Sequence, residues 1–248
     1  MRVIISPAKK MVVDQDSFSP KGKPEYLQET SEILRKMQNL SYQQAKSLWK
    51  TSDKLSRSNY AHLKKIDLTR HLTPAIFSYS GLQYQYMAAD ILTGPALNYL
   101  QQTLRILSGF YGVLRPFDGI VPYRLEMCAK LKLGRSRDLY SFWKDRLYLQ
   151  ISGHGPIINL ASKEYSSAVI PYLQEKDEFI DITFAHLING KLKTRATPAK
   201  IARGQMVHFI AEKHITSVGE LRNFQSPTYS FSPERSSPTN LVFVNENN

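Results

Sequence analysis

The sequence predicts a mixed α/β fold in which residues 1–248 form a single compact domain. Short apolar runs, typical of buried strands, alternate with segments whose apolar residues recur at helical spacing. A chain of 248 residues, 42% of them hydrophobic, can bury a sizeable core. The chain contains neither an internal repeat nor a linker-like stretch, which favours one unit over two.

The first part of the chain predicts one strand followed by three helices. Residues 3–5 are an apolar run ended by Ser6-Pro7, and residues 25–38 have the spacing of an amphipathic helix. Ser41 and Gln44 form a capping box for the next helix, and Ser52 can cap another. Together these two short helices, at 41–66, predict a helix-hairpin-helix-like element.

The rest of the chain predicts short strands, a loop-rich middle and one long helix. The aromatic-rich residues 75–87, with Gly81, indicate short strands and a turn. The other expected elements are a helix from Pro95, a loop at 108–127, a helix from Leu139 to Leu147 capped by Asp138, a strand at 156–160, a hairpin of 179–187 with 191–197, a helix at 198–214 and a loop at 225–240.

Composition excludes several classes of protein. No apolar run approaches the roughly 20 residues of a membrane span, and the N-terminus is too polar for a signal peptide. A lone cysteine, Cys128, excludes a disulfide framework, so we expect a cytoplasmic protein. Because no Gly-rich phosphate loop, His-based metal motif or serine-nucleophile elbow occurs, the sequence assigns no cofactor, no metal and no obligate protein partner.

The charge of the chain points to anionic partners. Lys and Arg number 33 against 21 Asp and Glu, which gives a formal net charge of +12 and an isoelectric point near 9.6. Such a protein is attracted to DNA, RNA or anionic lipid, although the same charge can serve solubility alone. No basic tail occurs, so we expect the cations on the folded surface.

The helix pair at 41–66 is the first candidate for contact with DNA. Its cations are Lys46 and Lys50 on one face of the first helix and Lys54, Arg57 and Lys64 within one arc of the second. Such hairpins bind phosphates without reading bases. The turn at 50–53 lacks their usual glycines, and an ordinary amphipathic pair with a solvated basic face is the alternative.

Three other segments carry candidate site residues. In the loop at 108–127, Arg115 with Asp118 and Arg124 with Glu126 suit phosphate binding or two structural ion pairs. Polar residues 159–165, including Glu164, follow a predicted strand, where α/β proteins place sites. The last helix presents Lys200 and Arg203 beside Gly204. A glycine inside a helix reduces its stability by about 1 kcal/mol relative to alanine. We therefore expect another part of the protein, or a ligand, to approach the helix closely at Gly204.

Five motifs are spread over nearly the whole chain in a characteristic order. They are ISPAK at 5–9, SDKL at 52–55, LSGFYGVLRPFDGIVPYRLEM at 107–127, INLASKEY at 158–165 and ARGQMVHFI at 202–210. They resemble the YaaA family of bacterial peroxide-stress proteins. The resemblance implies a cytosolic α/β protein with a helix-hairpin-helix-like element and a positively charged cleft that binds DNA. It also implies peroxide resistance through lower free iron.

The resemblance carries motif positions onto individual residues of this chain. These are Lys9, Ser52, Asp53, Lys54, Arg115, Asp118, Tyr123, Arg124, Glu126, Asn159, Ser162, Glu164, Lys200 and Arg203. The chain departs from the family pattern at Leu82 (where Asp is expected), Cys128 (Gly) and Ile201 (Lys).

Charge, the helix pair and the resemblance together predict a cytosolic DNA-binding protein that limits iron-dependent oxidative damage. The expected partner is duplex or branched DNA, bound largely without sequence preference. The expected contacts are Lys9, Lys46, Lys50, Lys54, Arg57, Lys64, Arg115, Arg124, Lys200 and Arg203. The alternative is an enzyme acting on nucleic acid or nucleotide, with Asp118, Glu126 and Glu164 as acids or bases beside Arg115 and Arg124.

Overall fold

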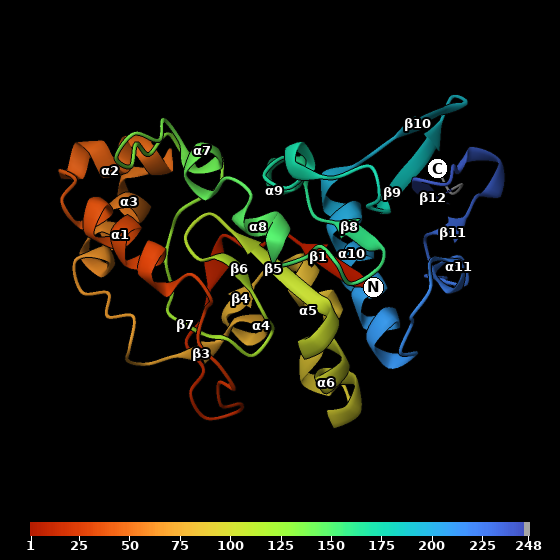
Figure 1. The fold of residues 1–248 in the computed structure, drawn as a ribbon, viewed down its shortest axis with the longest axis horizontal. Helices are drawn as coiled ribbons and strands as arrows, with labels where there is room; N and C mark the ends of the chain where they lie inside the picture. Colours follow the sequence, from red (N-terminus) through yellow and green to blue (C-terminus); the bar gives the residue numbers. More distant parts are fainter. Residues whose placement is uncertain (246–248) are drawn as a thin grey trace.

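A mixed sheet lies at the centre of the computed structural model, which describes residues 1–245 (Figure 1). Its strands are β1 (Arg2–Ile5), β5 (Leu104–Ser108), β6 (Gly112–Leu114), β8 (Ile157–Leu160), β9 (Phe179–Ile188), β10 (Lys191–Lys193), β11 (Ser230–Phe231) and β12 (Asn240–Asn245). They lie in the order β11-β12-β9-β8-β1-β5-β6, and β10 pairs with β9. The predicted α/β class is confirmed. Residues 246–248 of the predicted domain lie outside the described residues.

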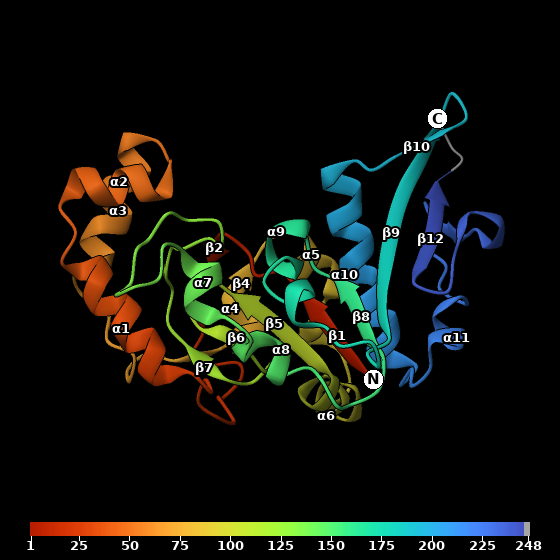
Figure 2. The ribbon, with the colours of Figure 1, turned by 45° about the horizontal axis from the view of Figure 1, so that its top comes forward.

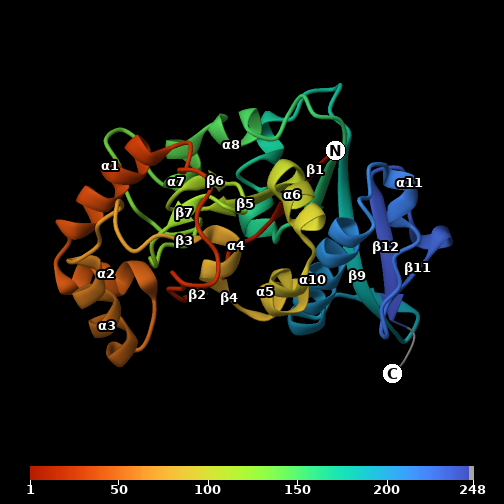
Figure 3. The ribbon, with the colours of Figure 1, turned by 90° about the horizontal axis from the view of Figure 1, so that it is seen from below.

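Helices cover both faces of this sheet. One face carries α5 (Leu82–Met87), α6 (Gly94–Thr103) and α10 (Ala196–Glu212), and the other carries α7 (Leu139–Trp143), α8 (Arg146–Leu149) and α9 (Lys163–Ser166) (Figure 3). The remaining elements are α4 (Ala75–Ser78), α11 (Val218–Leu221), three turns of 3-10 helix at Ala89–Ile91, Ile170–Tyr172 and Pro233–Arg235, and two small ladders, β2 (Lys10–Met11) with β4 (Tyr79–Ser80) and β3 (Thr73–Pro74) with β7 (Gly119–Ile120). Within residues 1–245, every helix is too short or too polar to span a membrane.

Three helices stand together at one end of the molecule, beyond β6. They are α1 (Leu27–Gln38), α2 (Tyr42–Trp49) and α3 (Asp53–Leu63) (Figure 2). The predicted capping box is confirmed, because Ser41 Oγ accepts from the Gln44 backbone and the Gln44 side chain accepts from the Ser41 backbone. Ser52 caps α3 as predicted, accepting from the Leu55 backbone N–H.

The central strands are apolar because helices cover them on both sides. Val3, Ile4 and Ile5 of β1 are fully buried, as are Ile106 and Leu107 of β5. One continuous hydrophobic cluster extends from these strands to α1 at one end and to β12 at the other. The sheet is therefore a rigid support for the loops that leave its edges.

The strand order reverses at β1. The chain first adds β5 on one side of β1 and later adds β8 on the other, both parallel to it. In such sheets a crevice forms beyond the carboxyl ends of the strands at the point of reversal. Ser6 follows β1 and Ser162 follows β8 at this point, and the Ser162 backbone N–H donates to Ser6 Oγ over 2.8 Å.

The prediction of short strands over 75–87 is wrong for most of that segment. Only Tyr79–Ser80 is a strand, whereas Ala75–Ser78 and Leu82–Met87 are helical. The reason is tertiary: α5 packs directly against α10 at Gly204. A Cβ at Gly204 would lie 2.2 Å from the Gln83 carbonyl oxygen. Close packing thus explains the glycine that the sequence places inside a helix.

We predict that Gly204→Ala lowers the free energy of unfolding by about 1–3 kcal/mol, the usual cost of overpacking. The loss occurs although alanine favours a helix, because the clash involves backbone that cannot rotate away. Urea denaturation measures it. Gly94→Ala is the control, since its added Cβ meets nothing within 4 Å. Equal stability of the two variants would contradict the packing argument.

Candidate functional site

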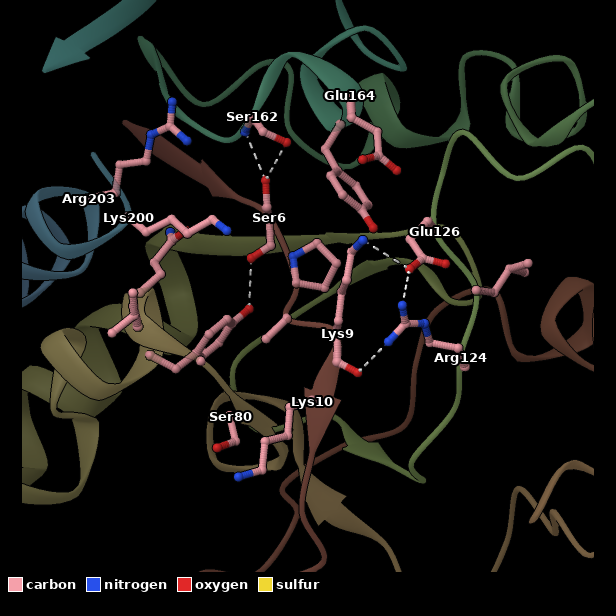
Figure 4. A pocket seen from close by; sticks show the side chains of 18 of the residues that line it. Ser6, Lys9, Lys10, Ser80, Arg124, Glu126, Ser162, Glu164, Lys200 and Arg203 are labelled. Atoms are coloured by element: carbon pink, nitrogen blue, oxygen red, sulfur yellow. Dashed lines mark hydrogen bonds and ion pairs between the residues drawn. The ribbon is translucent and has the colours of Figure 1, made fainter. Parts of the chain in front are cut away.

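A pocket of about 370 Å³ opens beyond the carboxyl ends of β1 and β8 (Figure 4). Its walls are residues 6–10 after β1, 80–84 at the start of α5, 123–126, 162 and 164–165 at the start of α9, and Lys200 and Arg203 of α10. Its charged residues are Lys9, Lys10, Arg124, Glu126, Glu164, Lys200 and Arg203. The fold thus brings together motifs that lie far apart in the sequence.

One wall of the pocket is a small network around Glu126. Arg124 Nη2 lies 2.7 Å and Lys9 Nζ lies 3.4 Å from Glu126 Oε1. Arg124 Nη1 also donates to the Lys9 carbonyl oxygen over 3.5 Å. Two cations therefore offset the charge of Glu126, and the Arg124 side chain is held in place.

The floor of the pocket is fixed by hydrogen bonds between the loops after β1 and β8. Ser6 Oγ donates to Ser162 Oγ over 3.2 Å, and the Ser6 carbonyl accepts from the Tyr84 hydroxyl over 3.0 Å. Below them, Asn159 Nδ2 donates to Asp181 Oδ1 over 2.7 Å, while Asn159 Oδ1 accepts from a backbone N–H. Asn159 therefore supports the loop rather than lining the pocket.

The opposite wall is cationic, and its two charged side chains form no ion pair within residues 1–245. Lys200 points toward Ser6 from α10, with Arg203 beside it (Figure 4). Within residues 1–245, neither side chain forms an ion pair, and Arg203 Nε is buried without a hydrogen bond. Burial lowers the pKa of Arg203, an effect that Asp181 counteracts. These donors are available to an anion.

Two larger hollows adjoin the pocket and meet it at Lys9. One, of about 580 Å³, lies against α3 and shares Lys10, Tyr123 and Arg124 with the pocket. The other, of about 800 Å³, lies against α1 and α2 and shares Glu126 and Glu164 with it. We call the three together the groove. Its basic residues are Lys9, Lys10, Lys36, Lys50, Arg124, Lys130, Lys132, Lys200 and Arg203, and its acidic residues are Glu126 and Glu164.

The cations of the helix pair fall into two groups. Lys46 and Arg57 are both tied to Asp53, at 2.7 Å and 2.8 Å, and Tyr42 also donates to this carboxylate. Lys64 Nζ donates to a backbone carbonyl of α1. Within residues 1–245, the side chains of Lys50 and Lys54 form neither an ion pair nor a hydrogen bond. Lys50 lines the groove.

The helix pair is anchored on the segment that carries Arg124. Trp49 Nε1 donates to the Arg124 carbonyl over 2.7 Å, and His62 Nε2 lies 2.8 Å from the Pro122 carbonyl. Since a carbonyl only accepts, the His62 ring donates. The basic helices and the wall of the pocket are therefore parts of one framework.

Arg115 and Asp118 lie outside the groove. Asp118 is 1% exposed and accepts from the Arg115 backbone N–H at 2.8 Å and from Arg115 Nε at 3.0 Å. Burial raises the pKa of Asp118, whereas Arg115 lowers it. The guanidinium also donates to the Lys23 carbonyl. This pair holds two loops together, and the structure does not place it with Glu126 and Glu164.

Cys128 lies on the wall of the groove next to Glu164. Its backbone N–H donates to Glu164 Oε1 over 3.1 Å. Partial burial, then Glu164 and Glu126, raise the pKa of the Cys128 thiol, which favours the protonated form. Within the described part of the chain, no three or more His, Cys, Asp and Glu residues are grouped as they would be to hold a metal ion.

Sequence reasoning missed part of the groove. Lys10, Lys36 and Lys132 line it without belonging to any site proposed from the sequence. The only local signal was the alternation of lysines at 130 and 132, which places both on one side of an extended segment.

Comparisons with known proteins agree with the resemblance found in the motifs. Residues 1–235 match the model of the family described as peroxide stress protein YaaA. A UPF0246 protein of Lactiplantibacillus plantarum is 56% identical over 245 residues, which cover 98% of this chain and 99% of that protein; the values for one of Lacticaseibacillus paracasei are the same. A UPF0246 protein of Agathobacter rectalis is 43% identical over 244 residues, 98% of each chain.

We predict that Asp53→Asn lowers the urea midpoint at pH 7. Hydrogen bonds from Lys46, Tyr42 and Arg57 hold the pKa of Asp53 well below its usual range. An acid with a lowered folded pKa stabilises the fold above its unfolded pKa, about 3.9, and this stability is lost as the pH falls through the folded pKa. The difference between variant and wild type should therefore shrink below about pH 4.

Asp90→Asn is the control for this measurement, because Asp90 is exposed and forms no ion pair within residues 1–245. Denaturation at a series of pH values from 7 to 3 compares the three proteins. A constant difference for Asp53→Asn at every pH would show that the ionised carboxylate is not what joins α2 to α3.

Proposed function

The chain belongs to the family of the peroxide stress protein YaaA, and we propose that it binds DNA through the phosphate backbone during peroxide stress. Family membership supports the role in the peroxide stress response. The DNA partner is inferred from the chemistry of the groove, and the expected ligand is duplex or branched DNA without a strong sequence preference.

The observation that carries the proposal is the imbalance of charge along the groove. Lysine and arginine line all three hollows, whereas the acids are Glu126 and Glu164. Glu126 is already offset by Lys9 and Arg124. Cations gathered without acidic partners repel one another, and a polyanion that lies among them relieves this repulsion.

The kind of cation favours contact with the backbone over base readout. The groove is lined mainly by lysines, which are flexible point charges that suit phosphate. Reading of bases requires bidentate side chains fixed in a DNA groove. Arg124, at the centre of the groove, instead forms an ion pair with Glu126 and a hydrogen bond to the Lys9 carbonyl, so its guanidinium is not free to bind a base. Binding should therefore depend on phosphate geometry.

This mode of binding offers a direct link to iron. A protein that neutralises phosphates releases the cations condensed around DNA. Fe²⁺ is a divalent cation, and the negative phosphates attract it as they attract other counterions. We propose that the bound protein displaces Fe²⁺ from the DNA surface, so that peroxide reacts with iron farther from the DNA.

An enzyme acting on nucleic acid or nucleotide is the second candidate. It is favoured by Glu126 and Glu164, which line the same pocket, with Glu164 outside any ion pair among the described residues. Asp118 takes no part in this arrangement because it is buried with Arg115. Mass spectrometry of DNA and nucleotides after incubation tests this function, and recovery of unchanged material excludes it for the substrates used.

We predict that the logarithm of DNA affinity falls steeply and linearly with the logarithm of salt concentration. Each phosphate contact contributes roughly 0.9 to the slope, so Lys130→Gln and Lys132→Gln, both in the hollow against α1 and α2, should each reduce it by about that amount. Fluorescence anisotropy of a labelled duplex between 50 and 200 mM salt measures the slope. Lys213→Gln, at the far end of α10, is the matched control and should leave it unchanged. A flat salt dependence would overturn the proposal.

The two groups of cations on the helix pair give a separate prediction. Lys50→Gln should reduce the salt slope by about 0.9, because Lys50 lines the groove and no ion pair within residues 1–245 holds its ammonium away from a phosphate. Lys46→Gln should reduce it by less than half as much, because Asp53 already holds that ammonium. The same anisotropy titrations measure both variants. Equal effects would show that Asp53 does not restrain Lys46 in solution.

A further inference from the structure

The pocket contains polar groups that no part of the protein satisfies. Gln83 is 7% exposed, and its Nε2 has no hydrogen-bond partner, like Arg203 Nε on the neighbouring wall. A buried donor without an acceptor has lost its hydrogen bonds to water without replacement, which destabilises the fold. Gly204 lets α10 approach α5 closely and so brings these two donors to one pocket. Their arrangement indicates a ligand with hydrogen-bond acceptors.

The size and the lining of the pocket restrict the ligand. Its volume of about 370 Å³ is at the small end of the range for small-molecule sites, roughly 300–1,000 Å³. A duplex cannot enter such a space. Buried Tyr84, Tyr123 and Tyr165 line it. The Tyr84 hydroxyl donates to the Ser6 carbonyl, and the Tyr123 hydroxyl forms hydrogen bonds with the hydroxyls of Ser108 and Tyr79. The hydroxyls of these two tyrosines are therefore already bonded, and their rings are the parts that can contact a ligand.

The charges of the two walls fix the orientation of such a ligand. An anionic group is attracted by Lys200 and Arg203 on one side, whereas on the other side Glu126 and Glu164 offset the charges of Lys9 and Arg124 (Figure 4). Aromatic rings favour a flat, partly apolar group, and a glutamine amide pairs with the edge of a nucleobase. A phosphate joined to a base meets all of these conditions.

We propose that this pocket binds a single nucleotide, with its phosphate at Lys200 and Arg203 and its base among the tyrosine rings next to Gln83. The nucleotide is either free or an unpaired unit of a DNA strand that lies in the groove. The second source rests on the proposed function, because the pocket shares Lys9 and Arg124 with the rest of the groove. The first source does not depend on DNA binding.

Calorimetric titration with dAMP and with inorganic phosphate tests the site itself. We expect dAMP to bind at least tenfold more tightly than phosphate. Lys200→Gln and Arg203→Gln should weaken dAMP at least fivefold, and Lys213→Gln is the control. Equal affinities for dAMP and phosphate, or no binding of dAMP, would overturn the proposal.

Gln83→Leu separates recognition of the base from recognition of the phosphate. The two side chains have similar volumes, and the substitution removes an unpaired buried donor, so the variant should fold. It should weaken dAMP about tenfold and leave the affinity for inorganic phosphate unchanged. If dAMP binds this variant as tightly as it binds the wild type, the base does not occupy the proposed place, and the assignment is wrong.

A duplex with one bulged adenine, compared with a fully paired duplex, distinguishes the two sources. A preference of tenfold or more for the bulged duplex, lost in Gln83→Leu, identifies an unpaired unit of DNA as the ligand. If dAMP binds but this preference is absent, the free nucleotide is the ligand, whether or not duplex DNA binds. If paired DNA binds with a steep salt slope and neither dAMP nor the bulge is favoured, the pocket inference fails and the proposed function stands.

Discussion

The position of the groove depends on the backbone of residues 122–126. The Pro122 and Arg124 carbonyls accept from the helix pair, through His62 and Trp49. The side chains of Arg124 and Glu126 meet Lys9, which follows the first strand of the sheet. Residues 122–126 therefore bind both the helix pair and the loop that follows β1. These two parts of the molecule cannot separate without breaking these bonds.

The distribution of ion pairs separates structural cations from those that can bind an anion. Arg115, Lys46 and Arg57 hold loops or helices together through Asp118 and Asp53. Apart from Lys9, which pairs with Glu126, the lysines of the groove form no ion pair in the described part of the chain. Like charges held close together reduce the stability of the free protein. The fold maintains them through its apolar core, and a bound polyanion would recover that stability.

Local signals in the sequence predicted the capped helices and the first strand, because caps and apolar runs act within a few residues. Leu82–Met87 was misassigned because this helix packs against α10 at Gly204, far along the chain. The meeting of Lys9 with Glu126 also depends on long-range packing. Isolated lysines such as Lys36 carry no local pattern. The local sequence left two interpretations of Arg115 and Asp118, phosphate binding or a structural ion pair, and the structure shows the ion pair.

The single cysteine of the chain has a practical consequence. Cys128 is exposed on the wall of the largest of the three hollows of the groove, beside Glu164, so a fluorophore or spin label attached to its sulfur would sit within the groove at one defined place. Since thiolate is the reactive species, the raised thiol pKa makes coupling slow at neutral pH and faster in mildly alkaline buffer. The molecule therefore carries a natural attachment point for an optical reporter of groove occupancy, with no competing thiols to remove.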